Sequence, residues 1–88
     1  MSHHTLRAGV SATGTATGMV LLDEATGRSW QLNATATLVL RALLAGDDPE
    51  HTAHRLHERR PQLAPDQAAD DVIACIDTLT HAHLVVTV

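Results

Sequence analysis

Apolar and polar residues alternate near the start of the chain, as they do in a strand with one buried face. Residues 5–11 place Leu6, Ala8 and Val10 on one side, which predicts a half-buried strand. Residues 12–18 consist only of Ala, Thr and Gly, a composition typical of a flexible connector. We therefore expect one strand followed by a flexible strand connector.

Two further strands are predicted to form a hairpin. Residues 19–23 (MVLLD) are a short apolar run that suits a central strand, and residues 28–32 (RSWQL) suit a third strand. Between them, Gly27 can adopt the positive φ that ends many tight turns. The N-terminal half therefore predicts a three-stranded antiparallel sheet.

The pattern then changes to a period of 3.6 residues, which predicts helices. Asn33 is a good N-cap for a helix over residues 34–45, and Gly46 is a good stop. The residues of this helix expected to face inward are Leu38, Val39, Ala42 and Leu43. The order of a sheet followed by helices predicts the α+β class.

Two more helices and a short tail follow. The second helix is expected from the cap Asp48 to about Arg60, where Pro61 breaks it, with Ala53 and Leu56 inward. The third helix begins at Pro65 and continues to about residue 82. The tail, residues 84–88 (LVVTV), is expected to be a short extended segment or strand.

The third predicted helix has three kinds of face on a helical wheel. Its expected core stripe consists of Ala69, Val72, Ile73, Ile76 and Leu79. A flank of short side chains consists of Ala68, Asp71, Cys75 and Ala82. An acidic flank consists of Asp66, Asp70 and Asp77. The short flank leaves room for a ligand beside the helix.

Composition and charge narrow the class of protein. A chain of 88 residues suits one small domain, residues 1–88, with a core of Ala, Leu and Val because Trp30 is its only aromatic residue. The net charge of −4 argues against general attraction to phosphate backbones. A single cysteine and the absence of a long apolar run predict a soluble cytoplasmic protein with no membrane partner.

Several short motifs follow one another in a fixed order. An apolar run leads into DEATG at residues 23–27 and LN at residues 32–33, then GDDPE at residues 46–50 and LTHAHLV at residues 79–85. In this order and spacing, the chain from Met19 onward resembles the PqqD-like group, the recognition elements of ribosomally made, post-translationally modified peptides (RiPPs). A free-standing copy of this size is most similar to the leader-binding half of the split B protein in lasso-peptide pathways.

The resemblance implies a small winged helix-turn-helix-like fold whose third strand lies at a sheet edge. It implies that the leader segment of a precursor peptide adds there as a further strand and packs against the last helix. The protein would be non-catalytic, without cofactor or metal, and would deliver the leader to a maturation enzyme such as a separate leader peptidase, with a cyclase as a further candidate partner. One departure from the family pattern is His83, which stands where a glycine is usual and predicts a differently shaped helix end.

The residues themselves also favour this site. An edge strand offers unpaired backbone groups, and residues 28–32 contain neither Pro nor Lys to block pairing. The strand residues expected to bind a leader are Arg28, Ser29, Trp30, Gln31 and Leu32. The residues expected to line the opposing wall are Ala68, Asp71, Val72, Cys75 and Leu79. Trp30 is expected either to form a wall of the groove or only to close the core.

Other functions have weaker support in the sequence. His51, His54 and His57 recur every third residue, but this spacing drifts by about 60° per step around a helix and does not converge on one metal ion. Cys75 lies in the middle of a helix, without the electropositive setting of a reactive thiol. His81 and His83 are expected to be cap or surface residues.

A nucleic-acid-binding winged helix is the alternative function. The expected reading helix is acidic, and no Arg or Lys follows Arg60, so phosphate contacts are not expected there. The basic cluster of Arg55, Arg59 and Arg60 is explained by charge compensation at a helix C-terminus, and contact with a partner protease is the alternative.

Overall fold

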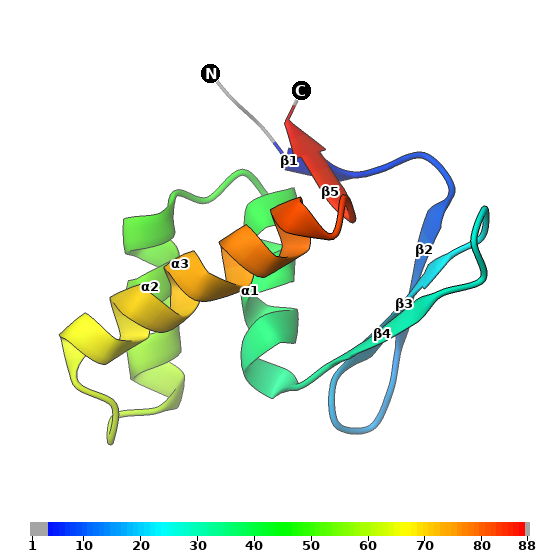
Figure 1. The fold of residues 1–88 in the computed structure, drawn as a ribbon. Helices are drawn as coiled ribbons and strands as arrows, with labels where there is room; N and C mark the ends of the chain where they lie inside the picture. Colours follow the sequence, from blue (N-terminus) through cyan, green and yellow to red (C-terminus); the bar gives the residue numbers. More distant parts are fainter. Residues whose placement is uncertain (1–3, 88) are drawn as a thin grey trace.

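A three-stranded sheet, a two-stranded sheet and three helices make up the fold of the computed structural model, which describes residues 4–87 (Figure 1). The elements are β1 (His4–Leu6), β2 (Val10–Gly14), β3 (Met19–Asp23), β4 (Ser29–Leu32), α1 (Ala34–Leu44), α2 (Pro49–Arg59), α3 (Pro65–His81) and β5 (Val85–Thr87). The expected α+β arrangement of a three-stranded antiparallel sheet followed by three helices is confirmed.

The three-stranded sheet has the order β2-β3-β4, so β3 is central and β4 lies at an edge. In the β3–β4 hairpin, Leu21 pairs with Trp30 and Met19 with Leu32. Gly27 has φ 77°, as expected for the turn. The hairpin therefore has the location and register that bring Trp30 and Leu32 onto one face of the sheet.

The prediction of a single strand over residues 5–11 is wrong. The chain turns at residues 7–9, where Gly9 has φ 88°, and the two halves join different sheets because β1 pairs with β5 while β2 pairs with β3. Ala8, expected to face inward, is exposed in this turn. The predicted connector is also shorter than expected, because residues 12–14 belong to β2.

The start of each of the first two helices is fixed by a side-chain cap, as the sequence predicts. The Asn33 side-chain oxygen accepts from the Ala36 amide at 2.8 Å, and that of Asp48 accepts from the His51 amide at 2.7 Å. Gly46, with φ 85°, follows the end of α1. Because Asn33 directly follows β4, α1 begins immediately after the edge strand.

The end of α3 adopts the conformation that usually requires glycine. His83 has φ 57°, its amide donates to the Thr80 carbonyl, and the Leu84 amide donates to the Leu79 carbonyl. These bonds form a Schellman motif, the same closure that glycine favours. The expected difference in shape at this helix end is therefore not found, and His83 adopts a left-handed conformation that L residues disfavour.

Two buried clusters meet at α1. The cluster facing the sheet contains Met19, Leu21, Leu40, Leu43, Leu79, Leu84 and Val85. The cluster between the helices contains Val39, Leu56, Ala68 and Val72. Since Val39 and Leu40 are adjacent, α1 contributes neighbouring residues to both clusters and joins the sheet to the helical layer.

The buried face of α3 is rotated relative to the predicted core stripe. Ile73 is 52% exposed, whereas Ala68, expected on the flank, is completely buried. Val72 and Leu79 are buried as expected. The helix is rich in alanine, so its apolar arc is broad, and packing against α1 and α2 decides which side is covered.

Arg7 joins the two sheets to the end of α3. Its guanidinium donates to the Asp23 carboxylate at 2.6 Å and to the His83 backbone carbonyl at 2.6 Å. Burial raises the pKa of Asp23. Hydrogen bonds from Arg7 and the Ala25 amide, together with the charge of Arg7, lower this pKa by a larger amount, so it lies below its ordinary value. The motif DEATG therefore supplies an anchoring carboxylate as well as a turn.

Within residues 4–87, no helix combines the length and the apolar character needed to cross a membrane.

Candidate functional site

The strand β4 presents an open edge. It pairs only with β3 among the described strands, and the backbone groups on its other side have no strand partner there. Along β4, Ser29 and Gln31 are exposed, whereas Trp30 and Leu32 are partly buried. An open edge with alternating side chains is the geometry that accepts an added peptide strand.

Trp30 is partly buried against the sheet-side core cluster. The guanidinium carbon of Arg28 lies 5.3 Å from the centroid of its ring, within cation–π range. Arg28 precedes β4, and its carbonyl accepts from the Asp23 amide at 2.9 Å. Trp30 thus packs on the core and keeps an accessible part, so the structure is compatible with both of its predicted roles.

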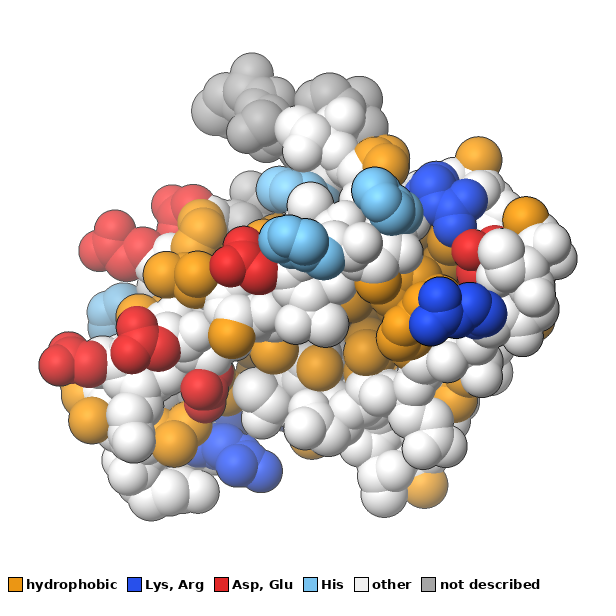
Figure 2. Space-filling view, viewed as in Figure 1, with side chains coloured by type: hydrophobic (Ala, Val, Ile, Leu, Met, Phe, Trp, Pro, Cys, Tyr) orange, Lys and Arg blue, Asp and Glu red, His pale blue; other side chains and the backbone are white. Residues whose placement is uncertain are grey.

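A shallow apolar hollow of about 180 Å³ lies beside β4, between α1 and α3. Its lining residues are Leu32, Ala36, Ala74, Cys75, Thr78 and Leu79, and we call this surface the edge groove. Figure 2 shows hydrophobic side chains exposed in the hollow between α3 and the sheet. Small residues at the helix surface leave space for the side chains of an incoming segment.

The structure places the predicted wall residues in three different environments. Cys75 and Leu79 line the edge groove. Ala68 and Val72 have no exposed surface, because they pack in the cluster between the helices. Asp71 is exposed, one turn before Cys75, and therefore lies at the rim of the groove.

Three groove residues were not identified from the sequence. Ala36 lies in the first turn of α1, while Ala74 and Thr78 lie one turn apart on α3. The available signal was the spacing of small residues at positions 74, 75 and 78, which continues the predicted short flank toward the end of the helix.

Cys75 has the properties of a packing residue. Burial and, to a lesser extent, the Asp71 carboxylate raise the pKa of its thiol. A raised pKa lowers the fraction of thiolate, the reactive form. The chemistry of the groove therefore favours non-covalent binding over nucleophilic attack.

The histidines have separate environments. His57 Nδ1 lies 2.8 Å from the Leu63 carbonyl, and His81 Nδ1 lies 2.9 Å from the Asp77 carbonyl. His51 and His54 are exposed. Across the described part of the chain, no group of three His, Cys, Asp or Glu side chains has an arrangement that could hold a metal ion.

The chain is similar to known proteins in both sequence and structure. The family model described as coenzyme PQQ synthesis protein D (PqqD) matches residues 18–85. A solved structure described as lasso peptide synthetase B1 complexed with the leader peptide is 32% identical, with a TM-score of 0.84 over 96% of this chain and 98% of that chain. No curated protein matches in the sequence search.

A second solved structure supports the fold. It is described as TbiB1 in complex with the TbiA(beta) leader peptide, is 18% identical, and superposes with a TM-score of 0.79 over 92% of this chain and 93% of that chain. A three-stranded antiparallel sheet followed by three helices is therefore an arrangement that solved structures also have.

Proposed function

The chain belongs to the PqqD family, and on that premise we propose that it binds the leader segment of a ribosomally made precursor peptide. The leader adds as a strand to the open edge of β4, and its side chains enter the edge groove. The protein performs no chemistry itself. The observation that carries this proposal is an unpaired strand edge beside an apolar groove, in a chain 32% identical to a B1 protein solved with a leader peptide.

The energetics require both parts of the site. About four ladder hydrogen bonds at roughly 0.5 to 1.5 kcal/mol net each give about 2 to 6 kcal/mol. Association costs an estimated 4 to 15 kcal/mol, so side-chain anchors must supply the difference. In the proposed complex Arg28, Ser29, Trp30, Gln31 and Leu32 provide the strand side.

On the helical side, the residues that line the groove are only partly those expected from the sequence. Cys75 and Leu79 provide the groove wall, together with Ala36, Ala74 and Thr78. Asp71 is placed at the rim, where it can meet a donor or cation of the leader. Ala68 and Val72 support this wall from the core rather than contact the ligand.

The biological role follows from capture without catalysis. The protein holds the leader while a separate maturation enzyme, such as a leader peptidase of lasso-peptide biosynthesis, acts on the precursor. A cyclase is a further candidate partner. A cytoplasmic location fits a chain with one cysteine and is part of the same proposal.

Peptide and DNA titrations at two salt concentrations test the function. We expect the leader of the cognate precursor to bind with weak dependence on salt, because the groove is apolar and the ladder is neutral. A DNA duplex is expected not to bind. Salt-sensitive DNA binding without leader binding would instead support the nucleic-acid alternative.

A further inference from the structure

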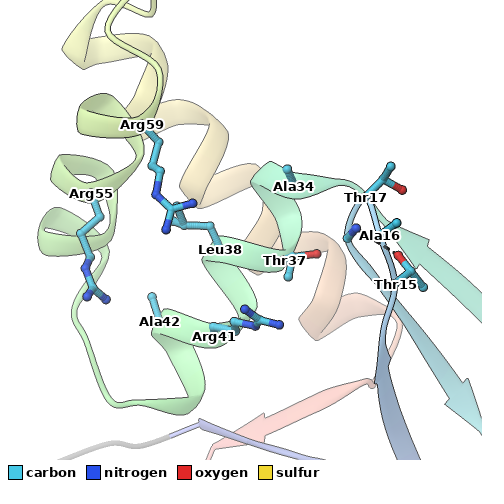
Figure 3. A pocket seen from close by; sticks show the side chains of 11 residues that line it. Thr15, Ala16, Thr17, Ala34, Thr37, Leu38, Arg41, Ala42, Arg55 and Arg59 are labelled. Carbon is cyan, nitrogen blue, oxygen red and sulfur yellow. Dashed lines mark hydrogen bonds between the residues drawn. The ribbon is translucent and has the colours of Figure 1, made fainter.

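Three of the six arginines lie around a cavity that shares no residue with the edge groove. The cavity has a volume of about 420 Å³ and lies between the β2–β3 turn, α1 and α2 (Figure 3). Arg41 comes from α1, and Arg55 and Arg59 come from successive turns of α2. We call this surface the arginine pocket.

The positive charge of the arginine pocket is only partly neutralised. Arg55 lies 3.2 Å from the Asp47 carboxylate in a largely exposed ion pair. Within residues 4–87, no carboxylate lies within ion-pair distance of Arg41 or Arg59. In a chain of net charge −4, this concentration of guanidinium groups produces a local field that attracts anions.

A buried hydroxyl in the same wall also lacks a partner. Thr37 is 7% exposed, and its Oγ1 atom is the buried side-chain oxygen or nitrogen without a hydrogen bond among the described residues. Thr37 lines the cavity, and Figure 3 shows its hydroxyl directed toward the turn that carries Thr15 and Thr17. An unsatisfied buried hydroxyl is unfavourable, so a group that reaches it from the cavity is stabilised.

Helix-end charge compensation explains only part of this arrangement. Arg41 and Arg59 lie in the last turns of α1 and α2, where positive charge is favourable. That effect does not require the two helix ends to contribute to one cavity, nor does it explain the unpaired hydroxyl of Thr37. Leu38 and Ala42 also line the pocket, and this apolar part of a mainly polar lining suits a ligand with both anionic and apolar groups.

We propose that the arginine pocket binds an acidic segment of a partner protein, in which an Asp or Glu carboxylate pairs with Arg41 and Arg59 beside an apolar side chain on Leu38. A nucleic acid is a poorer ligand because the chain as a whole carries a net charge of −4, which opposes contact with a phosphate backbone. The inference does not depend on leader binding, because the two surfaces share no lining residue.

The test uses the full-length chain labelled with ¹⁵N and a capped synthetic peptide of alternating Glu and Leu as the probe. We expect shifts at the amides of residues 15–18 and Thr37 and at the side-chain Nε–H groups of Arg41 and Arg59, with the amides of residues 29–32 unchanged. The same peptide with Gln in place of Glu is expected to cause no shift, and added salt is expected to weaken the Glu peptide. Absence of shifts at millimolar Glu peptide would overturn the proposal.

Variants that each remove one positive charge test whether the pocket causes binding of the Glu peptide. We expect Arg41→Gln and Arg59→Gln each to weaken the probe by roughly tenfold, the loss of one charge-assisted hydrogen bond. Arg60→Gln changes the net charge equally but lies outside the pocket, and it is expected to have no effect. Equal weakening by all three variants would overturn the proposal, because it would indicate general charge attraction.

Two further measurements complete the test. We expect Thr37→Val to weaken the probe without lowering the melting temperature, because the hydroxyl it removes has no partner in the protein. Titration with inorganic phosphate and with a DNA duplex checks the class of ligand. Shifts at the same residues with either of these at lower concentrations than the Glu peptide would overturn the assignment to an acidic protein segment.

Discussion

The edge groove and the arginine pocket are two hollows in contact with the same helix, and they differ in size and in charge. The edge groove is small, apolar and bordered by an open strand edge. The arginine pocket is larger and mainly polar, with three arginines among its lining residues. The first surface suits a peptide recognised by backbone pairing and shape, and the second suits a partner recognised by charge.

The same turn of α1 contributes to both surfaces. Ala36 lies in the edge groove, and Thr37 and Leu38 lie in the arginine pocket. Successive residues of a helix point about 100° apart, so neighbouring positions can serve different ligands. The comparison therefore predicts that substitutions on one surface leave the other unchanged.

Filling the edge groove is expected to have the largest effect. Ala74→Trp places a large side chain where the leader would insert, and we expect leader affinity to fall by roughly a hundredfold or more, as for loss of a central contact of an interface. Isothermal titration calorimetry measures this loss. The control is Ala45→Trp, at an exposed position outside both pockets. An equal loss of leader affinity in this variant would show that the leader does not bind in the groove.

Gly18 lies where the two surfaces approach each other. A Cβ at this position would collide with the Leu32 carbonyl at the end of β4, whereas a Cβ at Gly14 would meet nothing. We expect Gly18→Ala to lower the free energy of unfolding by about 1 to 3 kcal/mol and Gly14→Ala to change it little. Urea denaturation of both variants measures the difference, and equal stability would contradict the close approach.

Trp30 tests whether the open edge needs an aromatic anchor. We expect Trp30→Ala to weaken leader binding by about 1 kcal/mol or more if the ring contacts the leader. Calorimetry on a variant whose fold is confirmed by circular dichroism gives this value. Unchanged affinity would assign Trp30 to the core alone.

Substitution of His83 is expected to change stability but not binding, because His83 lies in neither pocket. A left-handed conformation costs an L residue roughly 1 to 2 kcal/mol, part of which the greater chain entropy of glycine cancels. We therefore expect His83→Gly to stabilise the fold by about 0.5 to 1 kcal/mol. Thermal unfolding measures this gain. Both ligand affinities should stay the same, and a change in either would link this helix end to binding.

The smallest effect is expected from a change of pH near neutrality, because the stabilisation by the Arg7–Asp23 pair is then constant. The pKa of Asp23 is lowered in the folded state, so its contribution is present above the unfolded pKa and is lost as the pH falls through the folded pKa. The free energy of unfolding should therefore be level near neutrality and fall in acid, below about pH 4. In Asp23→Asn this acid-dependent part should be smaller, and an unchanged pH profile would exclude the pair as its source.

Local signals predicted much of the fold. Asn33, Asp48 and Gly46 determine helix ends through bonds to residues a few positions away, so the sequence is sufficient to place them. The prediction of one strand over residues 5–11 failed because the pairing of this segment is not local. Its first part pairs with β5 at the other end of the chain, and the alternating pattern carries no information about that partner.

The candidate site was predicted in part for a similar reason. The edge position of the third strand was implied by the family resemblance and is found in the structure, where Cys75 and Leu79 line the hollow beside it. The sequence grouped Arg60 with Arg55 and Arg59 because they are close along the chain, whereas the folded pocket contains Arg41 instead. The packing of α1 against α2 brings Arg41 beside Arg55 and Arg59, and the residue spacing within either helix does not predict this packing.

Amide chemical shifts of the ¹⁵N-labelled chain during titration with the cognate precursor test whether a strand adds to β4. We expect large shifts and slowed hydrogen exchange for residues 27–32, because the added strand pairs with the backbone of β4. Leader binding that leaves these amides unchanged, or no binding with the precursor in excess, would contradict strand addition.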